Sequence, residues 1–133
     1  MAEKVAFELV SPDRMLMSVE ADAVAMPGME GDFGVLPGHA PLISALRAGV
    51  ITIEGGSEGP DQVYVAGGFA EVADERLTVL AEEAVPVDDM DDPDIEQRIQ
   101  EANDELAGAE DGEQRRLAEG KVGVLQEMLI SSR

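Results

Sequence analysis

The sequence contains no cysteine and no tryptophan, and it has one histidine and one tyrosine among 133 residues. Without cysteine the chain offers no disulfide, no thiolate ligand for a metal and no cysteine nucleophile. A single histidine, in the absence of cysteine, leaves no zinc site of ordinary ligand spacing. No stretch approaches the roughly 18 uninterrupted apolar residues of a membrane span, and residues 1–10 lack the apolar run of a signal peptide. We therefore expect a soluble protein of a reducing compartment, either cytosolic or peripheral to a membrane.

Basic residues are scarce as well. Nine Lys and Arg residues stand against 29 Asp and Glu residues, and the formal net charge is −20. Such an acidic chain repels phosphate backbones and anionic lipid headgroups, so we expect no nucleic-acid partner and no direct membrane insertion. Aromatic residues make up only 3% of the chain, but 44% of its residues are hydrophobic. Disordered acidic tails contain far fewer aliphatic side chains, and the composition therefore predicts a folded aliphatic core.

Residues 1–87 alternate between polar and apolar positions as β-strands do. Val5, Phe7 and Leu9, for example, fall on one face of a first strand at 5–10. Further short strands are expected at 15–19, 21–26, 42–46, 50–53, 62–66, 69–73, 77–81 and 84–87. Turn residues separate them at intervals of roughly 8–12 residues, which predicts an antiparallel sandwich or barrel. The pair Gly67 and Gly68 predicts a strand kink or a close approach of two backbones.

Residues 88–133 show the period of an α-helix instead. Asp92 is placed to cap a helix that has Pro93 at its first position. Asp111, with Gln114 three residues later, resembles the capping box of a second helix. The apolar stripes of the two helices, with spacings of four and three, are Ile95, Ile99, Ala102, Leu106 and Ala109, then Ala118, Val122, Leu125 and Leu129. Two such helices joined by a short turn predict an antiparallel helical hairpin.

The predicted hairpin has few large apolar side chains with which to hold itself together. Alanine fills two of the five positions in the first stripe, and Gly108, Gly120 and Gly123 each cost up to about 1 kcal/mol relative to alanine inside a helix. The hairpin is therefore interpreted either as a movable element or as a cap fixed against the sandwich. Amide hydrogen exchange distinguishes the two, because a movable hairpin loses protection before the strands do.

Residue patterns for catalysis and for metal binding are incomplete in this sequence. His39 lies in a turn bracketed by prolines. Residues 55–59 read Gly-Gly-Ser-Glu-Gly, but they fall in a predicted reverse turn between two strands and do not open a helix, as a nucleophile elbow does. The acidic run at 88–94 fails as a calcium loop, because Pro93 and Asp94 stand where an Asp or Asn and a glycine are required. We expect no catalytic residue and no metal ligand, and we interpret the acidic run as a linker and helix start.

The most informative segment runs from Glu30 to Leu42 and reads Glu-Gly-Asp-Phe-Gly-Val-Leu-Pro-Gly-His-Ala-Pro-Leu. Glycines supply backbone angles that other residues avoid and prolines fix φ, so the segment has one preferred shape. Rigid loops built around short strands usually present a surface. The segment resembles the signature loop of the epsilon subunits of F-type ATP synthases. Residues 49–53, 64–72 and 77–84 are similar to the same family in the same order.

The resemblance implies a fold of class β + α, in which an N-terminal antiparallel β-sandwich at 1–87 is followed by a C-terminal antiparallel two-helix hairpin at 88–133. It also implies a non-catalytic subunit of the rotor, or central stalk, of the proton-translocating enzyme. In that family the sandwich binds the gamma subunit and the ring of c subunits, and it helps to pass torque from the ring to the catalytic head. Such a subunit lies at the cytoplasmic face of the bacterial inner membrane, as a peripheral part of the complex.

The resemblance also assigns roles to individual residues. Glu30, Asp32, Phe33 and His39 match the loop that faces the c ring, and Asp32 occupies its acidic position. An acidic loop that meets basic c-subunit loops is electrostatically favourable.

In bacterial members of the family the hairpin opens along gamma and blocks rotation in the hydrolysis direction. It then lies among the alpha and beta subunits, with basic residues of its last helix on an acidic segment of beta. Arg115, Arg116 and Lys121 are the matching candidates here. The same cluster is equally well explained as charge balance with three neighbouring glutamates.

Some members bind a regulatory ATP at the hairpin, through a motif of Ile or Leu, Asp, two residues, Arg and Ala. In residues 90–95 of this chain, Asp94 stands where the arginine belongs. In residues 94–99, one extra residue separates the acid from Arg98, and no alanine follows. These departures argue against a regulatory ATP site, and we expect no cofactor.

The alternative to a rotor subunit is a stand-alone β-domain that binds an effector and carries a helical regulatory tail. A rotor subunit is expected to co-purify with a large membrane-bound ATPase, whereas the effector-binding domain is expected to be a soluble monomer with a saturable small-molecule pocket. An enzyme is a more distant alternative, because no nucleophile with a paired base is present.

Overall fold

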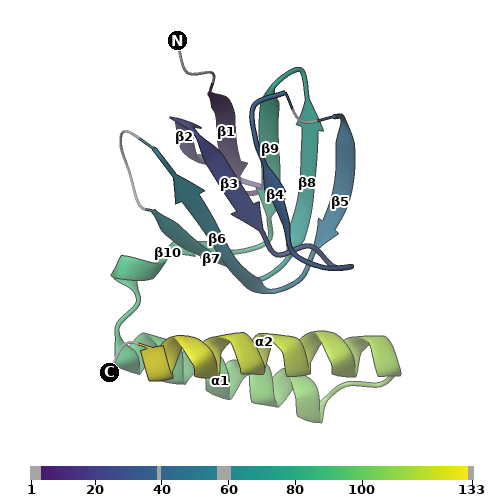
Figure 1. Cartoon of the computed structure of the whole chain (residues 1–133). Coiled ribbons are helices and arrows are strands. Elements are labelled where there is room, and N and C mark those ends of the chain that lie inside the picture. The colour runs from purple at the N-terminus through teal and green to yellow at the C-terminus, as the bar shows by residue number, and fades with distance from the viewer. Residues whose placement is uncertain (1–3, 39, 57–60, 132–133) are drawn as a thin grey trace. The chain divides into compact units, whose positions relative to one another are not determined.

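The structure, a computed structural model, describes residues 4–38, 40–56 and 61–131. The chain divides into two compact units, Met1–Val87 and Asp88–Arg133. Strands make up most of the first unit and helices most of the second (Figure 1).

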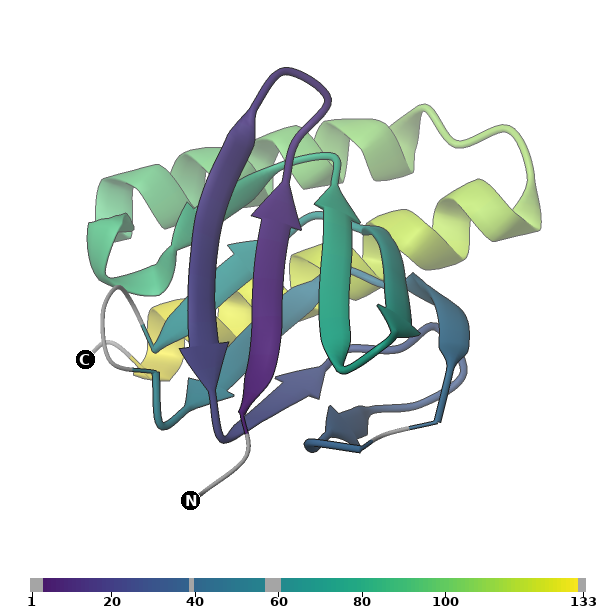
Figure 2. The same ribbon diagram turned by 90° about the horizontal axis from the view of Figure 1, so that it is seen from above.

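The strands of the first unit are β1 (Val5–Val10), β2 (Met15–Ala21), β3 (Ala23–Met26), β4 (Phe33–Val35), β5 (Leu42–Leu46), β6 (Gly49–Glu54), β7 (Gln62–Val65), β8 (Gly68–Ala73), β9 (Arg76–Ala81) and β10 (Ala84–Pro86). They form two five-stranded sheets among the described residues. Sheet 1 has the order β2-β1-β9-β8-β5, and its strands lie side by side in Figure 2. Sheet 2 has the order β10-β7-β6-β3-β4. The strand β4, inside the segment 30–42, was not among the expected strands.

The pairing within the sheets confirms the expected sandwich. Neighbouring strands are antiparallel in every pair except β1 and β9, which run parallel. A parallel pair joins strands that are distant in sequence. The first strand of the chain thereby lies between β2, its hairpin partner, and β9 near the end of the unit.

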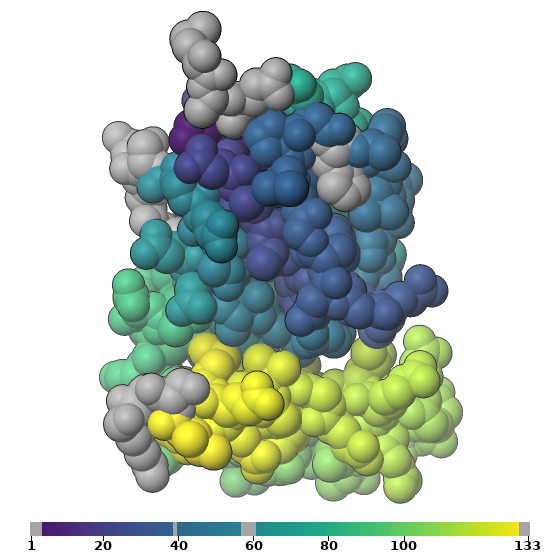
Figure 3. All heavy atoms as spheres, viewed as in Figure 1, coloured from purple at the N-terminus to yellow at the C-terminus, as the bar shows by residue number. Residues whose placement is uncertain are grey.

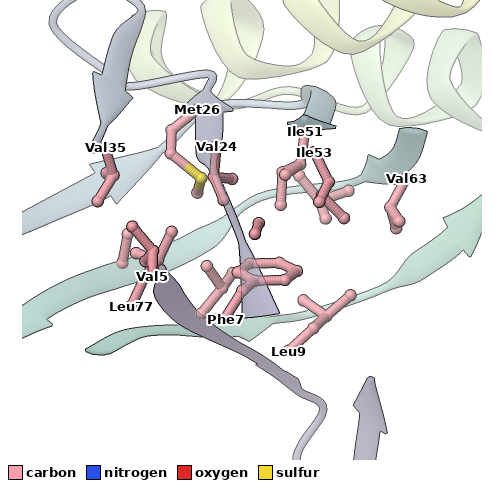
Figure 4. Packing of buried hydrophobic residues seen from close by; sticks show 14 of the residues in the cluster. Val5, Phe7, Leu9, Val24, Met26, Val35, Ile51, Ile53, Val63 and Leu77 are labelled. Atoms are coloured by element: carbon pink, nitrogen blue, oxygen red, sulfur yellow. The ribbon is translucent and has the colours of Figure 1, made fainter. Parts of the chain in front are cut away.

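Alternation along β1 places Val5, Phe7 and Leu9 in the core, as predicted. Val5, Phe7 and Leu9 expose at most 2% of their surface. Figure 4 shows side chains of the two sheets facing one another, with Val5, Phe7, Leu9 and Leu77 from sheet 1 and Val24, Met26, Val35, Ile51, Ile53 and Val63 from sheet 2. Each fully buried side chain of this size contributes about 1.5–3 kcal/mol relative to exposure. The core thus lies between the sheets and fixes which residues face outward.

The predicted close approach at the glycine pair is confirmed. Gly68 has a φ of +150°, and a Cβ atom built on it would lie 2.1 Å from the carbonyl oxygen of Leu80. Only glycine fits this position without displacing the neighbouring strand β9. The turn that follows β8 also uses positive φ angles, 52° at Asp74 and 63° at Glu75, which suit a two-residue hairpin.

A short 3-10 turn, η1 (Val87–Asp89), spans the boundary between the units, and the second unit contains two helices, α1 (Asp92–Ala107) and α2 (Gly112–Ser131). The prediction that Asp92 caps α1 is wrong by one residue. Asp91 is the cap, and its Oδ1 accepts a hydrogen bond from the backbone N–H of Asp94 at 3.0 Å. Asp91 has the extended backbone that a cap requires, with φ −88° and ψ 172°, whereas Asp92 is already helical.

The predicted start of the second helix is confirmed at Asp111. Its Oδ1 accepts a hydrogen bond from the N–H of Gln114 at 2.8 Å, and the Gln114 side chain returns to the N–H of Glu110 at 2.9 Å. The predicted apolar stripes are buried or half-buried, but Ala109 lies beyond α1, which ends at Ala107 with Gly108 as its C-cap. Ile95, Ala102, Ala118 and Leu125 are buried, and the remaining stripe residues are half-buried.

Candidate functional site

The loop between β3 and β4 belongs to both sheets of the sandwich. It leaves sheet 2 at Met26 and then runs along β5, the edge strand of sheet 1. The N–H of Met29 donates to the carbonyl of Ala45 at 2.9 Å, and the N–H of Arg47 donates to the carbonyl of Pro27 at 3.1 Å. Residues 27–29, the first part of the loop, are therefore tied to the sheet edge by backbone hydrogen bonds. Figure 3 shows this loop as a dark blue projection from the surface of the sandwich.

Glycine permits the tight turn in this loop. A Cβ atom on Gly28 would lie 2.3 Å from the carbonyl oxygen of Gly31 and 2.9 Å from the ring of Phe33. Gly31 itself has a φ of +142°, in the region that favours glycine. The sequence signal for a rigid loop thus corresponds to a turn in which residues 28, 31 and 33 are closely packed.

The acidic residue Asp32 is held by a residue that was not predicted from the sequence. Its Oδ1 accepts a hydrogen bond from Nη2 of Arg47, which immediately follows β5. The Asp32 side chain is nevertheless 70% exposed, and the Arg47 side chain is 40% exposed. The two residues are 15 positions apart, so no local sequence pattern could have predicted this pair.

The other predicted loop residues differ from one another in environment. Glu30 is exposed at the turn, and no described residue forms an ion pair with it. Phe33 is half-buried and packs against the core of the sandwich. It therefore anchors the loop, and only part of its side chain is open to a partner. Glu30 and Asp32 precede β4. His39 follows that strand and lies outside the described residues.

A second surface, which the sequence analysis missed, crosses the outer face of sheet 1. Phe69 pairs with Leu80 across β8 and β9, and Leu80 pairs with Val10 of β1. Val10 pairs in turn with Met15 of β2, and Phe69 pairs with Ala45 of β5. Paired residues project from the same face of a sheet, so these five form one apolar row across all five strands of sheet 1.

The apolar row is largely exposed. Phe69 exposes 59% of its surface, Met15 54% and Leu80 48%, whereas Val10 and Ala45 are half-buried. Ile43, two residues from Ala45 on the same strand face, is 73% exposed. A contiguous apolar surface of this kind commonly marks a protein interface. The signal in the sequence is that 77–81 carries apolar residues on both strand faces, with Leu80 opposite in direction to Leu77 and Val79.

Polar residues lie beside the apolar row, two to four positions along the strands. Arg76 of β9 forms an ion pair with Glu8 of β1 at 3.2 Å. A hollow of about 360 Å³ is lined by Glu71, Ala73, Asp74, Arg76 and Thr78. Its charged lining differs from the mostly apolar lining of typical small-molecule sites, so the hollow does not favour the effector-binding alternative.

The three predicted basic residues of the hairpin lie in two different environments. Nζ of Lys121 donates to the Glu105 carboxylate of α1, at 2.9 Å from Oε2 and 3.2 Å from Oε1. Arg115 and Arg116 are exposed in the first turns of α2. The three basic residues therefore differ in the structure, because Lys121 is paired with Glu105 whereas Arg115 and Arg116 are exposed.

Among the described residues, charged side chains stay outside the core. None of them is buried, and no group of three or more His, Asp or Glu side chains is arranged to hold a metal ion there. The described helices include none that is both long and apolar enough to cross a membrane. The features that these residues offer are a rigid acidic loop and an exposed apolar row.

Comparisons with known proteins agree on one family. The family model described as the ATP synthase delta/epsilon chain beta-sandwich domain matches residues 4–87. The ATP synthase epsilon chain of Paramagnetospirillum magneticum is 52% identical over 109 residues, which are 82% of each chain. That of Parvibaculum lavamentivorans is 44% identical over 128 residues, covering 96% of this chain and 97% of the relative. That of Rhodospirillum rubrum is 42% identical over 134 residues, covering 100% and 98%.

Solved structures show the same fold at lower sequence identity. A chain in the cryo-EM structure of the Euglena gracilis mitochondrial ATP synthase, with OSCP, F1 and c-ring, aligns with a TM-score of 0.72 at 24% identity, covering 98% of this chain and 82% of that one. A chain in the central stalk and c-ring structure of the Tetrahymena thermophila mitochondrial ATP synthase aligns with a TM-score of 0.67 at 12% identity, covering 96% and 97%. From the family model and the full-length relatives together, this chain belongs to the epsilon-chain family of ATP synthases.

Proposed function

We propose that this chain is a non-catalytic subunit of the central stalk, or rotor, of a proton-translocating F-type ATP synthase. In this role it binds the gamma subunit and the ring of c subunits and couples them to the catalytic head. The observation that carries the proposal is the exposed apolar row across sheet 1. A soluble domain that exposes three large apolar side chains in one row gains stability when a partner covers them.

Gamma is the proposed occupant of the apolar row. Full burial of a side chain such as Phe69 or Leu80 contributes about 1.5–3 kcal/mol, so the row can supply much of the affinity of a lasting contact. The ion pair of Arg76 and Glu8 borders the row and would give the contact a polar rim, as protein interfaces commonly have.

The loop at 27–33 is the proposed contact with the c ring. It projects from the sandwich, its backbone is fixed on β5, and it carries the exposed acids Glu30 and Asp32. Basic loops on the c subunits are attracted to these acids, and the net charge of −20 adds a long-range attraction. This attraction also supports a position at the cytoplasmic face of the bacterial inner membrane, peripheral to the bilayer.

The hairpin is the proposed regulatory element. When open, it lies along gamma among the alpha and beta subunits and inhibits ATP hydrolysis. Arg115 and Arg116 are exposed on α2 and available to an acidic segment of beta, whereas Lys121 is paired with Glu105. The regulation that we propose uses no bound nucleotide, because the acidic Asp94 in the first turn of α1 repels phosphate.

The experiment that tests the gamma contact is a pull-down of purified gamma by the full-length chain. Phe69→Glu and Leu80→Glu each place a charge in the apolar row and are expected to lower gamma binding at least about tenfold, because a charge buried without a partner costs more than 1.4 kcal/mol. Leu36→Glu is the matched control, since Leu36 is as exposed as Phe69, at 59%, but lies outside the row. Equal binding by all three variants would overturn the proposed interface.

A further inference from the structure

The acid that the sequence assigns to the ring contact does not stand alone in the structure. Arg47 donates from Nη2 to Oδ1 of Asp32 and from Nη1 to the backbone carbonyl of Ala48 at 3.3 Å. The guanidinium is therefore fixed at two points, one on the loop and one on the chain after β5. Among the described residues, no hydrogen bond reaches the second carboxylate oxygen, Oδ2 of Asp32.

We propose that Arg47 is a positioning residue for the ring contact. It holds Asp32 by one carboxylate oxygen and leaves the other able to accept a hydrogen bond from a basic side chain of the c ring. The inference rests on the function proposed above and adds to it a residue that does not itself touch the ring.

The surrounding backbone is built to admit this arginine. A Cβ atom on Gly49 would lie 3.2 Å from Nη1 of Arg47 and 2.6 Å from Cβ of Pro27. Glycine at 49 therefore leaves room for the guanidinium and for the start of the loop on the same side of the chain. The planar guanidinium suits the role, because its several donors hold a carboxylate and a carbonyl at once with little loss of side-chain freedom.

Positioning and net charge predict opposite effects when Arg47 is removed. Arg47→Gln deletes one positive charge, so the loop becomes more negative and its long-range attraction for a basic partner increases. If charge alone governed binding, the variant would bind the ring more tightly. Because the variant also frees the Asp32 side chain to rotate, the positioning role predicts weaker binding instead.

The experiment measures binding of the full-length chain, together with gamma, to purified c rings in nanodiscs. We expect Arg47→Gln to weaken binding roughly five- to tenfold, as loss of an oriented charged contact does. The matched control is Lys4→Gln, which breaks the ion pair of Lys4 with Asp22. Those side chains are 37% and 54% exposed, close to the 40% and 70% of Arg47 and Asp32, and the control also removes one positive charge. It is expected to change the affinity less than about twofold, because an exposed ion pair away from the contact has little effect on binding.

Three further variants separate positioning from general stability. Arg47→Lys keeps the charge and a donor, and it is expected to restore part of the lost affinity. Asp32→Asn and the double variant Asp32→Asn with Arg47→Gln are expected to bind equally, since Arg47 acts through the Asp32 carboxylate. An Arg47→Gln affinity equal to or higher than that of Lys4→Gln overturns the positioning role alone. Failure of the unmodified chain to bind the ring overturns the proposed function itself.

Discussion

The ammonium group of Lys121 lies within 3.2 Å of both carboxylate oxygens of Glu105 and so joins α2 to α1. The two residues are 16 positions apart and belong to different helices of the hairpin. One of the basic residues assigned to the beta contact is thus occupied within the hairpin when the two helices pack together. A contact of Lys121 with another subunit would have to share or replace this ion pair.

Replacing Glu105 by Gln is expected to loosen the hairpin. The pair is partly exposed, at 23% for Lys121 and 54% for Glu105, so its contribution is at most about 1 kcal/mol. Amide exchange along α2 should accelerate by up to about fivefold. In the assembled enzyme, a looser hairpin should also lower ATP hydrolysis. Glu127→Gln, on an exposed face of α2, removes the same charge as a control, and identical exchange in the two variants would contradict the role of the pair.

Deletion of residues 88–133 tests the hairpin as a whole. The sandwich should stay folded, because its core cluster is built from side chains of the first unit. Reconstitution of the truncated chain with gamma and the catalytic head should give a complex that hydrolyses ATP faster than one with the full chain. An unchanged rate would mean that the hairpin has only a structural role in this protein.

Two glycine-to-alanine changes should have opposite effects on stability. Gly68→Ala places a methyl group against the carbonyl of Leu80 at a φ of +150°, so it should destabilise the sandwich by about 1–3 kcal/mol. Gly120 lies in α2 with open space around its Cβ position, and Gly120→Ala should stabilise the hairpin by up to about 1 kcal/mol. Thermal unfolding followed by circular dichroism measures both. Shifts of the same sign would contradict the strand and helix environments described for the two glycines.

Phe7 and Phe69 allow a buried and an exposed phenylalanine of the same sandwich to be compared. Phe7 is fully buried, and Phe7→Ala should lower the free energy of unfolding by about 3–5 kcal/mol. Phe69 is 59% exposed on the outer face of sheet 1, and Phe69→Ala should change the stability of the free chain by less than about 0.5 kcal/mol. Urea titration measures both values. A large loss of stability for Phe69→Ala in the free chain would show that the apolar row is already covered.

The cap of α1 shows where sequence interpretation reaches its limit. Several acids stand in a row at 88–94, and each is a chemically suitable cap. The sequence therefore predicts a helix start within this run but leaves the residue open by one position. The choice of Asp91 depends on which backbone is extended, and that depends on how η1 approaches the helix.

The sequence by itself determined the strands other than β4, the two helices, the inward face of β1, most of the apolar stripes and the family, because alternation, helical period and loop motifs are properties of neighbouring residues. Only the tertiary structure decided that β1 pairs with β9, that Phe69 and Leu80 complete an apolar row across sheet 1, and that Arg47 holds Asp32. These relationships join residues far apart in the chain, and they follow from strand register. A shift of register by one residue would turn the same side chains to the opposite face of the sheet.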